Sequence, residues 1–553
     1  MRRAPDLLTW TLTAVLLAGC GATSSRAQTE YASGGELSQE QASYDVTFYE
    51  LDLRIDPADS SIAGSVTATA AVVHPTSRFV LDLDDRLVVD AVQVDGAARS
   101  YERRGGRLRI DLTRTYQPGE KVVVRVDYGG RPRVAPNPPW DGGLTWARTE
   151  DGSPWIATSC QVTGADVWWP VKDHPSDEPD SMAIRFTVPE PLVAASNGRL
   201  RGVEDAGDGW RTYDWFVSTP INVYNVALNA APYEAIEETH TGLNGETYPV
   251  AFYALPEDVD RARAFMPEIH DQLTFFEERF GPYPFRADKY GVAQTPHLGM
   301  EHQTIIAYGA NFDNGAMTGG RDWGFDALHH HELAHEWWGN LVTNVDWSDM
   351  WLHEGFGTYT QALYMEELGG MAGYHAYMDN MAFGIQNRMA VAPHGYRSST
   401  EIYGGDIYSK GAWVLHMLRF VIDDDPTFDR LLRRMAYPDP ALEEVTDGRH
   451  VRHATTQEFV HLAEQITGRD LGWFFDVYLR QAELPRLAAI RQGSRLTLRW
   501  DSPLDVPFTL PVEVDLGGEV FRVDMEGGEA VVDVPAGVDP VIDPNNWLLA
   551  DGL

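Results

Sequence analysis

The alternation of apolar and polar residues divides the chain into three parts. Between about residues 44 and 234, alternating runs such as Ser65-Val66-Thr67-Ala68-Thr69-Ala70 recur, and Pro-Gly, Gly-Gly and Asn-Gly pairs separate them. A period of two bounded by such turns predicts β-strands. We therefore expect the first part to be a β-rich domain.

The apolar spacing changes to a helical period after about residue 253. The segments that suit helices by this period are 259–280, 326–339, 350–368, 371–388, 406–422, 456–466 and 471–481. Residues 484–553 return to strand patterns separated by Gly and Pro turns. A mainly helical domain is thus expected to precede a small β-sandwich.

The chain of 553 residues is too long for a single hydrophobic core. The patterns predict a multidomain α+β protein with an N-terminal β-sheet domain over residues 43–238. They predict a mainly helical domain over residues 239–484 and a C-terminal β-sandwich over residues 485–553.

The first residues have the features of an export signal. Arg2 and Arg3 precede an apolar run over residues 7–17, and the run ends in Leu17-Ala18-Gly19-Cys20. This order predicts a signal peptide over residues 1–19. Its end resembles the lipobox of bacterial lipoproteins, which implies lipidation of Cys20 and anchoring in the bacterial cell envelope. The alternative is an ordinary signal peptide cut near Ala27.

Residues 20–42 contain much Ser, Gly, Gln and Glu, which predicts a flexible tether. The chain has 44 Lys and Arg against 82 Asp and Glu, a formal charge of −38. Such a charge repels polyanions, so nucleic-acid binding is not expected.

One run of residues has the pattern of a metal site. His331-Glu332-Leu333-Ala334-His335 fits H-E-x-x-H, and residues four apart lie on one face of a helix, so both imidazoles can bind one ion. Glu354, at 354 − 335 = 19 positions further on, is the candidate third ligand. Two histidines and a glutamate are the ligand set of thermolysin-like catalytic zinc. We expect one zinc ion per chain, although such a set also accepts cobalt or manganese.

These residues resemble the M1 family of gluzincin aminopeptidases, which includes aminopeptidase N and leukotriene A4 hydrolase. The family pattern is H-E-x-x-H, eighteen residues, then Glu, as here. Leu298-Gly299-Met300-Glu301-His302 resembles the exopeptidase segment G-x-M-E-N, with His302 in place of Asn. Tyr408-Ser409-Lys410-Gly411 resembles the segment with the catalytic tyrosine. The resemblance covers nearly the whole chain from residue 44 and implies a thermolysin-like catalytic domain.

The resemblance implies hydrolysis of the N-terminal peptide bond of oligopeptides with free N-termini. Glu332 is expected to act as general base on a zinc-activated water, and Tyr408 to stabilise the oxyanion. Glu301 is expected to bind the substrate α-ammonium, with Gln161 beside it.

Further residues are expected to support this site. Gly299 and Met300 suit an edge strand against which a peptide backbone can pair. Asp349 and Glu336 are candidates for orienting the ligating imidazoles. His329 and His330 are expected at a solvated helix start or behind the ligands.

Two alternatives remain at this point. One is a peptidase of endo type, or an epoxide hydrolase, on the same zinc. The other is a lipid-anchored binding protein that has kept the fold and lost the chemistry. The oligomeric state is not indicated by the sequence.

Overall fold

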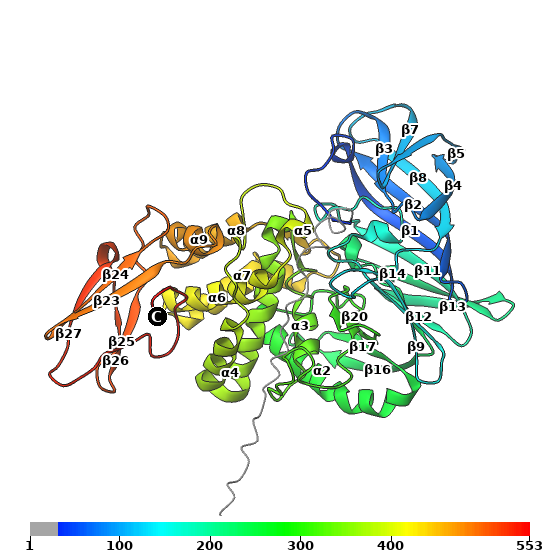
Figure 1. Ribbon diagram of the computed structural model, residues 1–553. Coiled ribbons are helices and arrows are strands. Elements are labelled where there is room, and N and C mark those ends of the chain that lie inside the picture. The colour runs from blue at the N-terminus through cyan, green and yellow to red at the C-terminus, as the bar shows by residue number, and fades with distance from the viewer. Residues whose placement is uncertain (1–30) are drawn as a thin grey trace, which may run out of the picture.

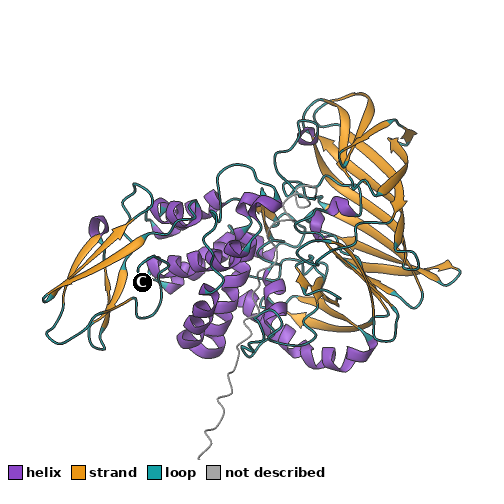
Figure 2. Cartoon of the chain, in the orientation of Figure 1, coloured by secondary structure: helices purple, strands orange, loops and turns teal. Residues whose placement is uncertain are grey.

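The computed structural model describes residues 31–553, which form three parts in a row (Figure 1). Strands build the N-terminal and C-terminal parts, and most helices lie between them (Figure 2). The predicted order of the three parts is confirmed. The predicted signal peptide, Cys20 and the first residues of the tether lie outside the described residues.

The N-terminal part centres on an eight-stranded sheet of order β13-β14-β11-β1-β2-β8-β4-β5. Alternate residues of β1, among them Leu51, Leu53 and Ile55, are buried, as the period of two requires. A four-stranded sheet, β12-β15-β10-β9, and a three-stranded sheet, β3-β7-β6, complete this part. Its strands are β1 (Tyr44–Asp56), β2 (Ser61–Val72), β3 (Thr76–Asp82), β4 (Leu87–Val94), β5 (Ala97–Ala98), β6 (Tyr101–Arg104), β7 (Arg107–Tyr116), β8 (Lys121–Gly130), β9 (Gly143–Arg148), β10 (Pro154–Ser159), β11 (Ser181–Pro189), β12 (Val193–Ala195), β13 (Arg199–Gly207), β14 (Trp210–Val217) and β15 (Asn229–Ala231).

The middle part begins with a five-stranded sheet of order β16-β17-β18-β20-β19. The predicted boundary between residues 238 and 239 falls inside β16, which pairs along its whole length with β17. The sheet of the middle part therefore begins at residue 234, within the range predicted for the N-terminal domain. Its strands are β16 (Glu234–Thr241), β17 (Thr247–Ala254), β18 (Tyr290–Gln294), β19 (Gly299–Met300), β20 (Ile306–Tyr308), β21 (Val342–Asn344) and β22 (Arg452–Ala454).

The helices of the middle part differ from the predictions at several places, and the short helix α5 is one that was not predicted. The predicted helix 326–339 ends at Ala334. The predicted segments 350–368 and 371–388 correspond to the two halves of α4, which is broken at Gly370, where φ is 64°, and the second half ends at Ala382. Helix α7 was not predicted, although Asp424 caps it and Pro426 stands in its first turn. The helices are α2 (Val259–Phe280), α3 (Ala327–Ala334), α4 (Trp351–Ala382), α5 (Ser399–Ile402), α6 (Gly405–Ile422), α7 (Asp425–Ala436), α8 (Thr456–Thr467) and α9 (Gly472–Leu479).

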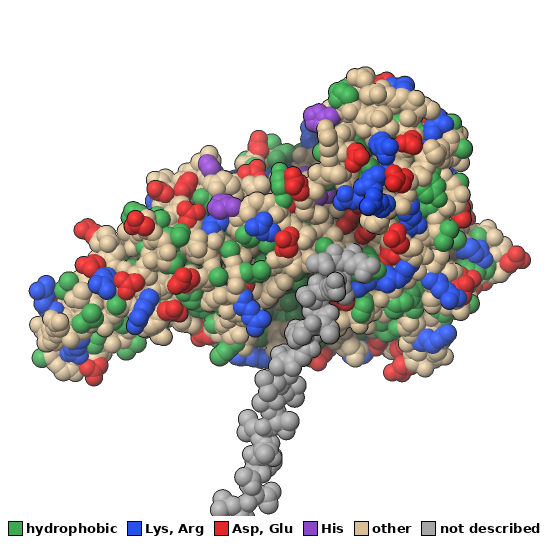
Figure 3. Space-filling view, turned by 45° about the horizontal axis from the view of Figure 1, so that its top comes forward, with side chains coloured by type: hydrophobic (Ala, Val, Ile, Leu, Met, Phe, Trp, Pro, Cys, Tyr) green, Lys and Arg blue, Asp and Glu red, His purple; other side chains and the backbone are tan. Residues whose placement is uncertain are grey.

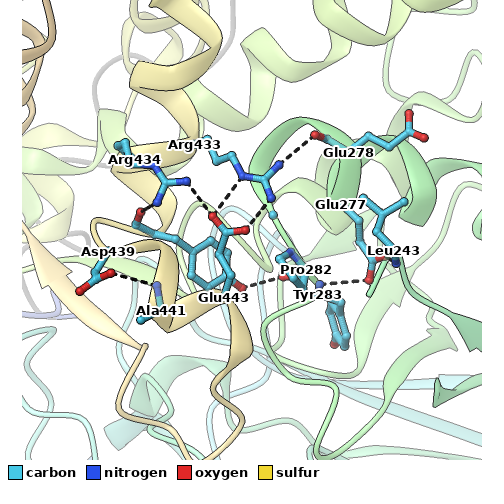
Figure 4. Close-up of polar contacts among 12 residues, drawn as sticks. Leu243, Glu277, Glu278, Pro282, Tyr283, Arg433, Arg434, Asp439, Ala441 and Glu443 are labelled. Carbon is cyan, nitrogen blue, oxygen red and sulfur yellow. Dashed lines mark hydrogen bonds and ion pairs between the residues drawn. The ribbon is translucent and has the colours of Figure 1, made fainter. Parts of the chain in front are cut away.

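A charged cluster fastens α7 to the end of α2 (Figure 4). Glu443, in the short turn after α7, accepts hydrogen bonds from Arg433 and Arg434. Arg433 also donates to the carbonyl oxygen of Glu278 on α2 at 3.2 Å. This cluster joins α7 and the turn after it to α2.

The C-terminal part consists of two three-stranded sheets, of order β23-β24-β27 and β26-β25-β28. Leu498 and Val514, one from each sheet, are fully buried in the core. The strands are β23 (Arg486–Gln492), β24 (Arg495–Asp501), β25 (Val512–Asp515), β26 (Val520–Val523), β27 (Glu529–Asp533) and β28 (Val541–Ile542).

The described part of the predicted tether is folded, contrary to the expectation of a flexible segment. The backbone N–H of Ser33 donates to the Ser399 hydroxyl at 3.0 Å, and Gly34 forms a β-bridge with Ser398. A Cβ atom on Gly34 would come within 2.3 Å of the Trp347 ring, so only glycine fits there. These contacts join segments far apart in sequence, and composition alone does not indicate them.

Acidic and basic side chains are interspersed over the face shown in Figure 3. None of the helices among the described residues is long and apolar enough to cross a membrane.

Candidate active site

The three predicted metal ligands meet between α3 and α4. Asp326 caps α3 by accepting a hydrogen bond from the backbone N–H of His329 at 2.9 Å. The capped start of the helix fixes which of its residues face the same side. His331 and His335 then point the same way, with their Nε2 atoms 3.2 Å apart. Glu354, in the first turn of α4, places its Oε2 atom 3.4 Å from both nitrogens.

The distances among these atoms fit a zinc ion. Ligands about 2.0–2.2 Å from a tetrahedral zinc lie about 3.3–3.6 Å from one another. The Oε2 atom of Glu354 is buried and has no hydrogen-bond partner among the described residues, as expected of an atom that binds a metal. Burial lowers the pKa of His335, but the negative charge of Glu354 outweighs it and raises the pKa to about 10 without an ion. A metal ion would replace that proton.

The groups that orient the imidazoles differ from the prediction. The Nδ1 atom of His335 lies 2.8 Å from the carbonyl oxygen of Trp338, which leaves its Nε2 atom free for a metal. Glu336 instead accepts the backbone N–H of Thr304 at 2.7 Å, and Asp349 accepts from Thr456. Both predicted carboxylates therefore hold neighbouring segments in place and do not contact the ligands.

His329 and His330 are both fully buried, so the expected solvated helix start is wrong. His329 bonds to Gln272 and to the Tyr290 hydroxyl. His330 packs among aromatic rings, with the Phe276 ring centre 4.7 Å away. These histidines belong to the core behind the metal site.

Glu332 faces the edge strand β19. A Cβ atom on Gly299 would come within 2.3 Å of Glu332 Oε1 and 2.7 Å of the Leu328 side chain. Glycine at this position therefore keeps room for the carboxylate. Burial raises the pKa of Glu332 well above its ordinary value, and the charge of His335 partly offsets this.

Glu301 is buried near the metal ligands, and the side chain of Gln161 links it to one of them. The amide nitrogen of Gln161 donates both to Glu301 Oε1 and, at 3.0 Å, to Glu354 Oε1. The hydroxyl of Tyr224 donates to the same oxygen of Glu301 at 2.8 Å. Tyr224 was missed, because it lies in a short turn of the N-terminal part with no motif around it.

Tyr408 lies on the other side of the ligands, near the start of α6. Its ring centre is 6.0 Å from that of His331, and its hydroxyl is 2.6 Å from that of Tyr403. Burial, followed by the nearby charge of Glu354, raises the pKa of Tyr408 well above its usual value. The phenol therefore stays protonated and can donate a hydrogen bond.

One cavity of about 370 Å³ is lined by the three metal ligands together with Gln161, Glu301, Glu332, Tyr403 and Tyr408. Tyr224 is not among its lining residues and reaches the site through its hydrogen bond to Glu301. The cavity contains three carboxylates, those of Glu301, Glu332 and Glu354, and no Lys or Arg among the described residues that line it. A larger hollow of about 710 Å³ beside residues 32–41 has side chains of both charges. The described residues contain one group of three ligands suited to a metal, and it is in the smaller cavity.

Two sequence profiles match the chain. The Peptidase family M1 domain matches residues 266–478, and the Peptidase M1 N-terminal domain matches residues 45–224. The chain belongs to peptidase family M1. The family and its ligand set identify zinc as the metal of the site.

Known members of family M1 resemble this chain over different lengths. Leucine aminopeptidase 2 of Yarrowia lipolytica is 27% identical over 58% of this chain and 46% of its own length. Glutamyl aminopeptidase of Sus scrofa is 25% identical over 66% of this chain and 41% of its own length. The chain thus spans less than half the length of these two relatives.

A solved M1 zinc metallopeptidase from Deinococcus radiodurans, bound to a Tyr-Ser-Ala substrate, has a similar fold. It matches with a TM-score of 0.67 and 26% identity, over 82% of this chain and 98% of that chain. The likeness therefore extends over nearly all of a shorter M1 peptidase.

Proposed function

We propose that this M1 chain is a zinc aminopeptidase that removes single residues from peptides with free N-termini. One observation carries the proposal: Gln161 joins the buried carboxylate of Glu301 to the metal ligand Glu354. In a substrate, one Cα atom separates the α-ammonium from the scissile carbonyl. An ammonium at Glu301 would therefore place that carbonyl beside the metal.

The charges in the cavity support this assignment. The cavity brings three buried carboxylates together with no Lys or Arg among the described residues that line it, and an ionised carboxylate that is buried without a partner costs several kcal/mol to desolvate. A zinc ion contributes two positive charges and a substrate ammonium contributes one, which together balance Glu301, Glu332 and Glu354. A substrate with a blocked N-terminus would leave Glu301 uncompensated.

The remaining groups are placed for hydrolysis. Zinc, when bound, acts as a Lewis acid that polarises a carbonyl and lowers the pKa of water to about 7. Glu332 would take the proton from the attacking water and pass it to the leaving amine. Tyr403 would donate to Tyr408, which leaves the Tyr408 proton free to bond the oxyanion.

The test is cleavage of matched tripeptides with free and acetylated N-termini, followed by mass spectrometry with and without a zinc chelator. We expect stepwise release of single residues from the free peptide only, and none with chelator. The matched control is Glu332→Gln, which should retain zinc and lose turnover. Internal cleavage of the acetylated peptide would indicate an endopeptidase, and no turnover of any peptide would indicate the binding protein.

We also propose that the protein is exported and anchored through a lipid on Cys20. The support is the order of charged, apolar and small residues before Cys20. Labelling with a fatty acid should mark the wild-type protein, and Cys20→Ala should abolish the label and release the protein from membranes. A label that persists in Cys20→Ala would overturn the anchor.

A further inference from the structure

Part of the cavity, beside the charged groups, is apolar. Six of the side chains that line the cavity are apolar, and together they form what we call the apolar wall: Pro139, Trp140, Leu298, Met300, Met317 and Leu328. No Lys or Arg is among the described residues that line it. We infer that this wall selects substrates whose N-terminal residue has a large apolar side chain, an inference that rests on the proposed aminopeptidase function.

The position of a substrate follows from its two anchored groups. With its ammonium at Glu301 and its carbonyl at the metal ligands, the Cα atom of the first residue lies between them. The space next to Tyr408 is needed for the oxyanion that forms from the substrate carbonyl. The side chain of the first substrate residue therefore points to the apolar wall. Gly299 has no room for a side chain of its own, which leaves this wall open beside the edge strand.

Loops from two parts of the chain form the outer wall. Trp140 lies between β8 and β9, in a turn closed by the backbone bond from Asp141 to Asn137 at 2.8 Å and by the pair of Asp141 with Arg133 at 2.7 Å. Met317 lies between β20 and α3, in a turn closed by the bond from Gly320 to Gly315 at 2.9 Å. Both side chains are therefore held at the cavity while keeping contact with solvent.

Charged first residues fit this wall poorly. An acidic side chain would be buried near carboxylates without a cation to pair with. A basic side chain would find Glu301 paired with the α-ammonium and Glu354 with the metal. Burying a Leu, Met or Phe side chain there should raise kcat/KM about 10- to 100-fold over Ala.

The experiment measures kcat/KM for the aminoacyl-coumarin amides of Leu, Met, Phe, Ala, Glu and Arg with the zinc-loaded enzyme. We expect Leu, Met and Phe to exceed the other three. Met317→Arg should raise the ratio of kcat/KM for the Glu amide to kcat/KM for the Leu amide at least about tenfold, because the arginine supplies a cation that can pair with the acidic side chain. The matched control is Met371→Arg on α4, outside this cavity, which should leave the ratio unchanged.

A second variant covers the case in which Met317→Arg does not fold. Trp140 is 50% exposed, so the Trp140→Ala variant should fold. It should lower kcat/KM for the Phe amide relative to kcat/KM for the Ala amide. The inference is overturned if Glu or Arg is the best substrate, or if a folded variant at Met317 or Trp140 leaves the ratios unchanged. Absence of turnover with every amide would overturn the proposed function as well, so the two failures are distinguishable.

Discussion

Removal of the Tyr224 hydroxyl tests how the substrate ammonium is recognised. Tyr224→Phe deletes one donor to Glu301 Oε1, at 2.8 Å, and keeps the ring that packs against Trp347. A hydrogen bond to a charged group contributes about 1.5–3 kcal/mol. Since Gln161 still donates to the same oxygen, we take about 1.5 kcal/mol, or roughly a tenfold loss of kcat/KM.

The assay is steady-state hydrolysis of a leucyl amide at saturating zinc. The loss should appear mainly in KM, because Glu301 holds the ammonium in the ground state as well as in the transition state. The matched control is Tyr233→Phe, which deletes a buried hydroxyl bonded to the Gln294 carbonyl, outside the cavity. It should leave KM unchanged.

A double-mutant cycle separates this role from a general structural one. In a Glu301→Gln background, Tyr224→Phe should have little further effect, because the charge that it supports is gone. An equal loss in both backgrounds, or no loss in the wild-type background, would refute the reasoning.

Four other predictions follow from the site and its surroundings. Glu332→Gln should retain one zinc per chain by elemental analysis and lose about 10²- to 10⁴-fold in kcat, and an active variant would remove the general base. Tyr408→Phe should lower kcat by about 100-fold with little change in KM, whereas a change confined to KM would contradict its role at the oxyanion. Glu301→Ala should raise KM for free N-termini and leave zinc content unchanged; an unaltered KM would contradict the ammonium site. Burial raises the pKa of Glu178 from 4.5 to about 8, so its ionisation destabilises the fold increasingly as the pH rises between these values. The melting temperature of the Glu178→Gln variant should therefore exceed that of the wild type by more at pH 8 than at pH 5. An equal difference at the two pH values would contradict this expectation.

The metal ligands could be predicted from the sequence because their geometry is local. His331 and His335 are one helical turn apart, and Glu354 begins the next helix, so spacing alone brings them together. The edge strand of Gly299 and Met300 was likewise indicated by local pattern and is confirmed.

The rest of the site depends on contacts between distant segments. Tyr224 and Trp140 come from the N-terminal part, whereas the middle part supplies most of the cavity. Trp140 lines the cavity, and Tyr224 bonds to Glu301, which lines it. Glu336 and Asp349 stand next to ligands in sequence, yet helix direction turns them towards Thr304 and Thr456. Folding of residues 31–42 was missed for the same reason, since their partners lie hundreds of positions away.

The central claim is that His331, His335 and Glu354 hold one catalytic zinc ion. The most direct measurement is an anomalous difference map from crystals of the purified protein, collected at the zinc edge. We predict one strong peak within about 2.0–2.2 Å of the two Nε2 atoms and the Glu354 carboxylate. No peak at this position, or a single peak elsewhere, would contradict the account.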